Sequence, residues 1–268
     1  MVVQDSSSSS EPDPILGKNS IHWLVCRETY KTERSPIIGV EDEWVIGYQD
    51  QETCVYHQVD EEGTVLDYCI IGFRGTAATG DIYDDYKLSL RGNNGDFPRA
   101  QEGIQFTSQF MEQNPELIIQ LTGHSLGGAI ARITGQTLGL GIVTFNAAAP
   151  PSNPVQTGPN EIDYHIVFDL ISAWQQPNTI RIDKGYRPTT KYRYSIIPIT
   201  WVQKTIVDLS EAHKLSSFSN EKPGKIIDAE TENNIIQTWF YSIPVILRLM
   251  LMKFLFEFSG NIGLPEIN

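Results

Sequence analysis

The chain is poor in cysteine, with only Cys26, Cys54 and Cys69 among its 268 residues, and none of them shows the C-x-x-C spacing of metal or redox sites. Three cysteines cannot all pair within one chain. Cys54 and Cys69 flank a turn-forming stretch at residues 60–63, so two readings remain for them: a cross-strand disulfide, or two buried thiols, which we favour. We therefore expect no metal site and a reducing, cytoplasmic location, with peripheral contact to membranes left open.

The start of the chain lacks the parts of a secretory signal. Residues 1–14, MVVQDSSSSSEPDP, contain neither a basic beginning nor an apolar stretch, so we expect no such signal. The serine run and the acidic residues after it are typical of disordered chain. We predict a disordered tail over residues 1–16, followed by one folded domain over residues 17–234.

Basic residues are also scarce. The formal net charge is −13, and residues 1–70 hold fourteen acidic against four basic side chains. A nucleic-acid-binding surface needs a stripe of lysine and arginine that this chain does not offer. The excess acid also excludes electrostatic attraction to anionic lipid headgroups, so any membrane contact must be apolar.

The chain does contain a regular alternation of strand-like and helix-like segments. The expected strands are residues 44–48, 53–58, 64–73, 117–122, 142–145 and 164–168, and the expected helices are residues 99–113 and 128–138. Apolar strands that alternate with helices indicate parallel pairing, and strands apolar throughout indicate a sheet covered on both faces. The sequence therefore predicts an α/β fold with a mostly parallel central sheet and helices on both faces.

The last segment, residues 235–268, is a separate apolar unit in this interpretation. Seventeen of the 24 residues in 235–258 are apolar, but Pro244, Arg248, Lys253 and Glu257 interrupt them. Three readings fit: a helix buried against the domain or a partner, a helix at the membrane surface, or a membrane span. The charged residues make a span costly. The oligomeric state is left open.

The strongest motif is Gly123-His124-Ser125-Leu126-Gly127, which follows an apolar strand and precedes a helix. This is the context of a nucleophile elbow, G-x-S-x-G, in which a strained turn exposes the serine at the carboxyl edge of the sheet. Glycines on either side allow strand and helix to approach closely. We therefore predict Ser125 as a nucleophile, with the Leu126 N–H as one oxyanion donor.

A second motif, Phe73-Arg74-Gly75-Thr76, ends an earlier strand. Acyl-transfer enzymes with a nucleophile elbow take their second oxyanion donor from a loop in this position. Thr76 is the candidate, because it offers both a backbone N–H and a hydroxyl.

These motifs, together with the acidic segment at residues 81–85 and Gly128 after the elbow, resemble the class 3 lipase family over about residues 40–220. The resemblance implies an α/β-hydrolase fold and esterase or lipase activity. It also implies a lid over the site within residues 77–97.

A Ser-Asp-His triad needs a later carboxylate and a later histidine. Asp169 is the preferred acid because it follows an apolar strand as the family's acid does; Asp163 precedes that strand, and Asp183 lies in a basic, turn-like stretch. His213 is the preferred base, in the late position typical of the family. The other histidines are set aside: two precede the elbow, one lies inside it, and one is placed at the wrong sheet edge (His22, His57, His124 and His165).

The sequence thus predicts a serine hydrolase that cleaves the carboxylic ester of a lipid, as a lipase or phospholipase, through an acyl-enzyme and without a cofactor. Its partners would be the ester substrate and a membrane surface contacted through residues 235–258. Other readings stay open: a thioesterase or serine peptidase on the same fold, or a non-catalytic lipid-binding descendant.

Overall fold

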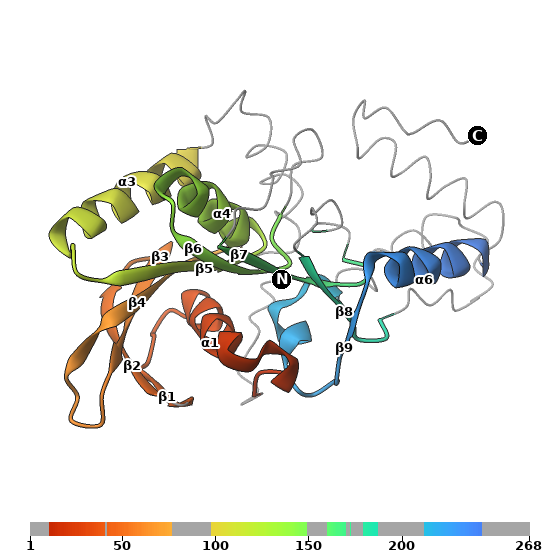
Figure 1. The fold of residues 1–268 in the computed structure, drawn as a ribbon, viewed down its shortest axis with the longest axis horizontal. Helices are drawn as coiled ribbons and strands as arrows, with labels where there is room; N and C mark the ends of the chain where they lie inside the picture. Colours follow the sequence, from red (N-terminus) through yellow and green to blue (C-terminus); the bar gives the residue numbers. More distant parts are fainter. Residues whose placement is uncertain are drawn as a thin grey trace.

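A computed structural model of the chain describes residues 11–40, 42–76, 98–148, 160–169, 172, 179–186 and 212–242. These residues form one twisted sheet with helices on both faces (Figure 1). Within the described residues the sheet has nine strands, and their order in space is their order along the chain. The predicted α/β fold is confirmed.

The centre of the sheet is parallel and its two edges are antiparallel. Strands β4 to β8 pair in parallel, whereas β1 to β4 and β8 to β9 pair antiparallel. The strands are β1 Ile37–Val40, β2 Asp42–Gln49, β3 Thr53–Val59, β4 Val65–Phe73, β5 Ile118–His124, β6 Gly141–Phe145, β7 Glu161–Ile166, β8 Thr179–Asp183 and β9 Lys225–Ile227. The carboxyl ends of β4 to β7 therefore meet at one edge, where parallel sheets place their sites.

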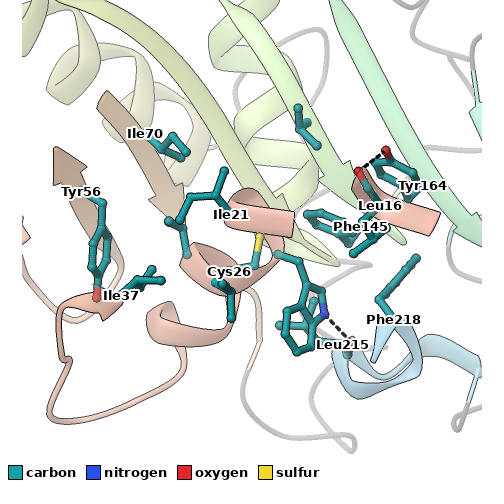
Figure 2. Close-up of a cluster of buried hydrophobic side chains, with 14 of the residues drawn as sticks. Leu16, Ile21, Cys26, Ile37, Tyr56, Ile70, Phe145, Tyr164, Leu215 and Phe218 are labelled. Carbon is teal, nitrogen blue, oxygen red and sulfur yellow. Dashed lines mark hydrogen bonds between the residues drawn. The ribbon is translucent and has the colours of Figure 1, made fainter. Parts of the chain in front are cut away.

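Alternation along the strands divides the core into two clusters. On β4, Ile70 faces the layer of α1 (Ser20–Thr29), whereas Ile71 and Phe73 face α4 (Leu126–Leu138). Helix α3 (Pro98–Gln113) packs outside α4. Figure 2 shows the first cluster, in which side chains of α1 lie against aromatic rings from the sheet. Both faces are thus buried, as the apolar strands predicted.

The ordered part of the chain begins earlier than predicted. Residues 11–16, which we expected in a disordered tail, are described: Pro12 bridges to Ser219, and a short 3₁₀ helix, η1, spans Pro14–Asn19. The reason is a buried ion pair, since Lys184 is fully buried and its ammonium group binds the carboxylate of Asp13. Acidic composition suggested a solvated tail, but this acid has a distant partner.

Several elements were not predicted. Helix α1, strand β1 and the last two strands, β8 and β9, lie outside the expected segments. The three cysteines are free and buried. Cys54 pairs with Gly72 in the β3–β4 register and Cys69 with His57, and the two thiols belong to opposite core clusters, so they cannot form the cross-strand disulfide.

The predicted boundary at residue 235 falls inside a helix. Helix α6 spans Ala229–Ser242, so residues 235–242 continue an element that begins within the domain. Residues 243–268 lie outside the described part of the chain, as does the expected lid at residues 77–97. Among the residues that are described, no helix has the length and apolar character needed to cross a membrane.

Candidate active site

Ser125 sits in a strained turn between β5 and α4. Its backbone has φ 57° and ψ −124°, a region that side-chain-bearing residues rarely adopt. The turn is fixed on both sides, because the Ser125 N–H donates to Phe145 O (3.3 Å) and Ser125 O accepts from Ala148 N–H (2.9 Å). The strain is held by the surrounding backbone, which is the arrangement the elbow motif predicted.

The glycines of the motif are required by close backbone approaches. A methyl group on Gly123 would collide with the carbonyl of Gly127, and one on Gly127 would collide with the carbonyl of Phe73. At Gly128 it would lie 2.6 Å from Cβ of Ala147. The start of α4 is therefore pressed against β5, β6 and the end of β4 at once. Only residues without a side chain fit there.

The structure brings together Ser125, His213 and Asp169. Nε2 of His213 lies 2.8 Å from Oγ of Ser125, and Nδ1 lies 3.0 Å from each carboxylate oxygen of Asp169. All three side chains are buried, with exposed fractions of 3, 6 and 1 per cent. With Nδ1–H donated to Asp169, Nε2 is left to accept the proton of Ser125.

The charge of Asp169 is stabilised in place. Burial alone would raise the pKa of this carboxyl, but the His213 ring, the His165 ring and the Ser172 hydroxyl outweigh it and hold the pKa below its usual range. Asp169 is thus a buried carboxylate whose hydrogen bonds compensate for the loss of water.

Asn146, which follows β6, connects the base to the sheet. Its amide donates to Ala212 O (2.8 Å), next to His213, and its Oδ1 accepts from the Ile166 N–H (2.9 Å). The backbone at Asn146 has φ 44°, a conformation that asparagine tolerates better than most residues. One side chain therefore links the strand that precedes Asp169 to the segment that carries His213.

His124, inside the elbow, holds the same segment from the other side. Its Nε2–H donates to the carbonyl of His213 (2.6 Å), and its Nδ1 accepts from the hydroxyl of Tyr30 (2.9 Å). Burial, and next the nearby His213 ring, lower the pKa of His124 to about 3. The ring is therefore neutral at ordinary pH, and its role in the structure is to fix the His213 backbone.

Of the two residues predicted as oxyanion donors, Leu126 directly follows Ser125 and Thr76 belongs to the loop after β4. Leu126 is the first residue of α4, so its N–H has no partner within the helix. Thr76 follows Gly75, where an added methyl group would collide with the Tyr30 hydroxyl and the His124 carbonyl. The loop after β4 therefore passes close to the elbow.

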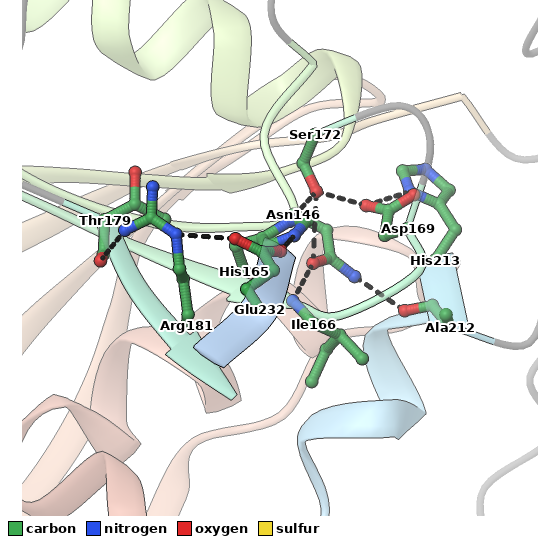
Figure 3. A network of polar contacts seen from close by, with 10 residues as sticks. All are labelled: Asn146, His165, Ile166, Asp169, Ser172, Thr179, Arg181, Ala212, His213 and Glu232. Carbon is green, nitrogen blue, oxygen red and sulfur yellow. Dashed lines mark hydrogen bonds and ion pairs between the residues drawn. The ribbon is translucent and has the colours of Figure 1, made fainter. Parts of the chain in front are cut away.

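Sequence reasoning missed the residues behind Asp169. Figure 3 shows Ser172 between Asp169 and His165, and Glu232 of α6 on the far side of His165. The strand pattern alone places His165 at the wrong edge of the sheet. In the structure its ring contacts Ser172, and Ser172 contacts Asp169. No local signal in the sequence marks these contacts.

The alternative acids lie elsewhere. Asp163 is buried within β7 beside Thr144 and Arg132, and Asp183 ends β8 and accepts from the Gly185 N–H (2.7 Å). Within the described ranges, no group of three histidine, cysteine or acidic side chains is arranged to hold a metal ion.

A family model matches the chain. The model of a phospholipase-like family, described as the Tle-like phospholipase domain, matches residues 31–178, which is more than half of the chain. That range contains the FRGT loop, the elbow and Asp169.

Among curated proteins, the chain is similar to two fungal relatives, each named as the putative lipase ATG15. It is 45% identical over 47 residues to the Eremothecium gossypii protein and 48% over 44 residues to the Candida glabrata protein. These segments cover 18% and 16% of this chain and 9% of each relative. The matches therefore span less than a tenth of the length of these relatives.

Solved structures with some likeness are fungal lipases. Lip2 lipase from Yarrowia lipolytica is 14% identical, with a TM-score of 0.38, over 66% of this chain and 82% of that one. The Rhizomucor miehei lipase propeptide complex is 16% identical, with a TM-score of 0.40, over 67% and 71% of the two chains.

Proposed function

Because the chain belongs to the Tle-like phospholipase domain family, we propose that it hydrolyses the carboxylic ester of a lipid through a triad of Ser125, His213 and Asp169. Membership of this family makes the chain a carboxylic ester hydrolase of the lipase type, as the sequence motifs predicted. The observation that carries the triad is the hydrogen-bonded chain from Ser125 through both nitrogens of His213 to Asp169.

In the proposed reaction, Ser125 Oγ attacks the ester carbonyl while His213 Nε2 takes its proton. Asp169 holds the ring in the tautomer that leaves Nε2 free and stabilises the imidazolium that forms. His213 then gives the proton to the departing alcohol, which leaves an acyl group on Ser125. A water molecule, deprotonated by His213 in turn, attacks this acyl-enzyme, and His213 returns the proton to Ser125 Oγ as the carboxylic acid leaves.

The negative charge on the carbonyl oxygen needs donors that are already in place. The Leu126 N–H at the start of α4 is one, favoured further by the dipole of the helix. Thr76 is the proposed second. Loss of one such donor commonly lowers turnover by about a hundredfold or more.

The nucleophile is tested with a fluorophosphonate probe and a soluble nitrophenyl ester. Wild-type protein should react covalently with the probe and hydrolyse the ester, whereas folded Ser125→Ala should do neither. Ser217→Ala is a matched control, because Ser217 is equally buried but lies in the 3₁₀ helix η3 (Leu215–Phe218), outside the triad. Wild-type turnover in Ser125→Ala would exclude the proposed nucleophile.

The substrate is tested with a panel of phospholipids, acylglycerols and thioesters. We expect cleavage of a lipid carboxylic ester at the highest kcat/KM, in line with the family and with the names of the fungal relatives. Faster hydrolysis of thioesters would move the assignment to a thioesterase.

Contact of residues 235–258 with a membrane is tested by removing residues 243–268, which should reduce binding to liposomes more than turnover of the soluble ester.

A further inference from the structure

A second chain of polar contacts runs from Asp169 away from the nucleophile and ends on α6 (Figure 3). The Ser172 hydroxyl donates to Oδ2 of Asp169, and Oγ of Ser172 lies 2.6 Å from Nδ1 of His165. Nε2 of His165 lies 2.8 Å from Oε1 of Glu232. The proposed mechanism uses none of these three side chains.

The donors and acceptors along this run of contacts can be assigned from the two carboxylates at its ends. A serine hydroxyl has a single proton, so Ser172 can donate to Asp169 only if Nδ1 of His165 donates to Ser172. A carboxylate accepts only, so Glu232 requires a proton on Nε2 of the same ring. In this hydrogen-bond pattern both ring nitrogens act as donors, Nδ1 to Ser172 and Nε2 to Glu232.

Glu232 is itself fixed. Its second oxygen, Oε2, accepts from Nε of Arg181 on β8 (2.6 Å), and Arg181 also donates to Thr179 O (3.1 Å). Burial tends to raise the pKa of Glu232, but the His165 hydrogen bond and Arg181 outweigh it, so the pKa lies below its usual range. Glu232 therefore faces His165 as a carboxylate.

Apolar side chains also pack α6 against the residue that precedes Asp169. Trp239 packs edge-on against Phe168, with ring centroids 5.3 Å apart, and Ile235 and Ile236 join that cluster. Phe168 directly precedes Asp169 and has φ 72°, so its backbone is held in an unfavourable conformation. The helix thus contacts the side chain of Phe168, the residue before Asp169, and is linked through His165 and Ser172 to the Asp169 carboxylate.

We propose that Glu232, His165 and Ser172 are positioning residues that hold the carboxylate of Asp169 toward His213, so that α6 forms part of the catalytic unit. This inference rests on the proposed triad. When glutamine replaces Glu232, the His165 ring no longer faces a carboxylate, and we expect it to keep a proton on Nε2 and none on Nδ1. The Ser172 hydroxyl then turns to that nitrogen, and Asp169 loses a donor.

The test compares Glu232→Gln with Glu230→Gln, which removes an exposed carboxylate from the first turn of the same helix. Loss of a hydrogen bond to a charged group should lower kcat for a soluble ester by about tenfold in Glu232→Gln, with KM nearly unchanged. Glu230→Gln should match wild type, and Glu232→Asp should recover part of kcat. A kcat within about twofold of wild type in Glu232→Gln would overturn the proposal.

A spectroscopic measurement separates this role from a purely structural one. In protein with ¹⁵N-labelled histidine, Nδ1 of His165 should carry a proton in wild type and lose it in Glu232→Gln. If Nδ1 is unprotonated in wild type, the proposal is wrong even if the enzyme is active. If wild type hydrolyses no ester, the proposed function fails, but this signal still reports on the chain of contacts.

If Glu232→Gln does not fold, Ser172→Ala tests whether these side chains position Asp169. It removes only the buried hydroxyl that contacts Asp169, and it should lower kcat as much as Glu232→Gln does. Wild-type kcat in folded Ser172→Ala would contradict the proposal.

Discussion

The two halves of the candidate site are built differently. The nucleophile half lies within residues 123–128, where strand, turn and helix start follow one another and the glycines allow the close approaches. The acid–base half is assembled from separate segments: Asn146 and His124 hold the backbone at His213, and Ser172 bonds the carboxylate of Asp169. The first half is therefore a local property of the sequence, whereas the second depends on long-range hydrogen bonds.

The largest expected effect is on the acid–base half. Asp169→Asn keeps the shape of the side chain but favours the wrong tautomer of His213, so kcat should fall by about 10⁴-fold. We expect circular dichroism to show a folded protein. Steady-state kinetics on a soluble ester checks this, with Asp67→Asn, an exposed acid on β4, as the control. Full activity in Asp169→Asn would move the acid elsewhere.

The nucleophile half should respond through stability. Gly127→Ala places a methyl group against the Phe73 carbonyl, where backbone must move, and should cost about 1–3 kcal/mol or more of unfolding free energy. Gly141→Ala is the matched control, because the atoms nearest to its methyl group would belong to the Gln120 side chain rather than to backbone. Urea unfolding measures both. Equal stability of the two variants would show that the elbow is less tightly constrained than the contacts indicate.

Tyr30→Phe tests the connection between the halves. Without the hydroxyl, the buried Nδ1 of His124 loses its hydrogen bond from Tyr30, and the cost should be about 1 kcal/mol, or a fall in Tm of roughly 2–4 °C. Tyr48→Phe, which removes an exposed hydroxyl bonded to Asp50, should leave Tm unchanged within about 1 °C. Calorimetry distinguishes them, and an unchanged Tm in Tyr30→Phe would show that this contact does not stabilise the fold.

The smallest expected effect concerns a buried acid outside the site. Burial raises the pKa of Asp163 from 3.8 to about 7, although Arg132 opposes the shift. A raised folded pKa stabilises the protein fully below the unfolded value, and this contribution is lost as pH rises through about 7. The Tm advantage of wild type over Asp163→Asn should therefore shrink between pH 5 and pH 8. An advantage that grows over this range would contradict the assignment.

The same contrast explains what the sequence could predict. The parallel core of the sheet and the elbow follow from patterns within a few residues, and the family's spacing pointed to Asp169 and His213. Asn146, Ser172, His165 and Glu232 carry no local pattern, because what places them is a contact with a residue distant in the chain. The ordered start of the chain was missed for the same reason, since its Asp13 binds Lys184, 171 residues away.

The most direct test of the central claim is the rate at which Ser125 reacts with a fluorophosphonate, followed by intact-protein mass spectrometry and peptide mapping. We predict one covalent adduct, on Ser125, which forms slowly in both His213→Ala and Asp169→Asn and at the wild-type rate in the Ser217→Ala control. An adduct on another serine, or undiminished labelling of Ser125 in His213→Ala, would show that the three residues do not act as one catalytic unit.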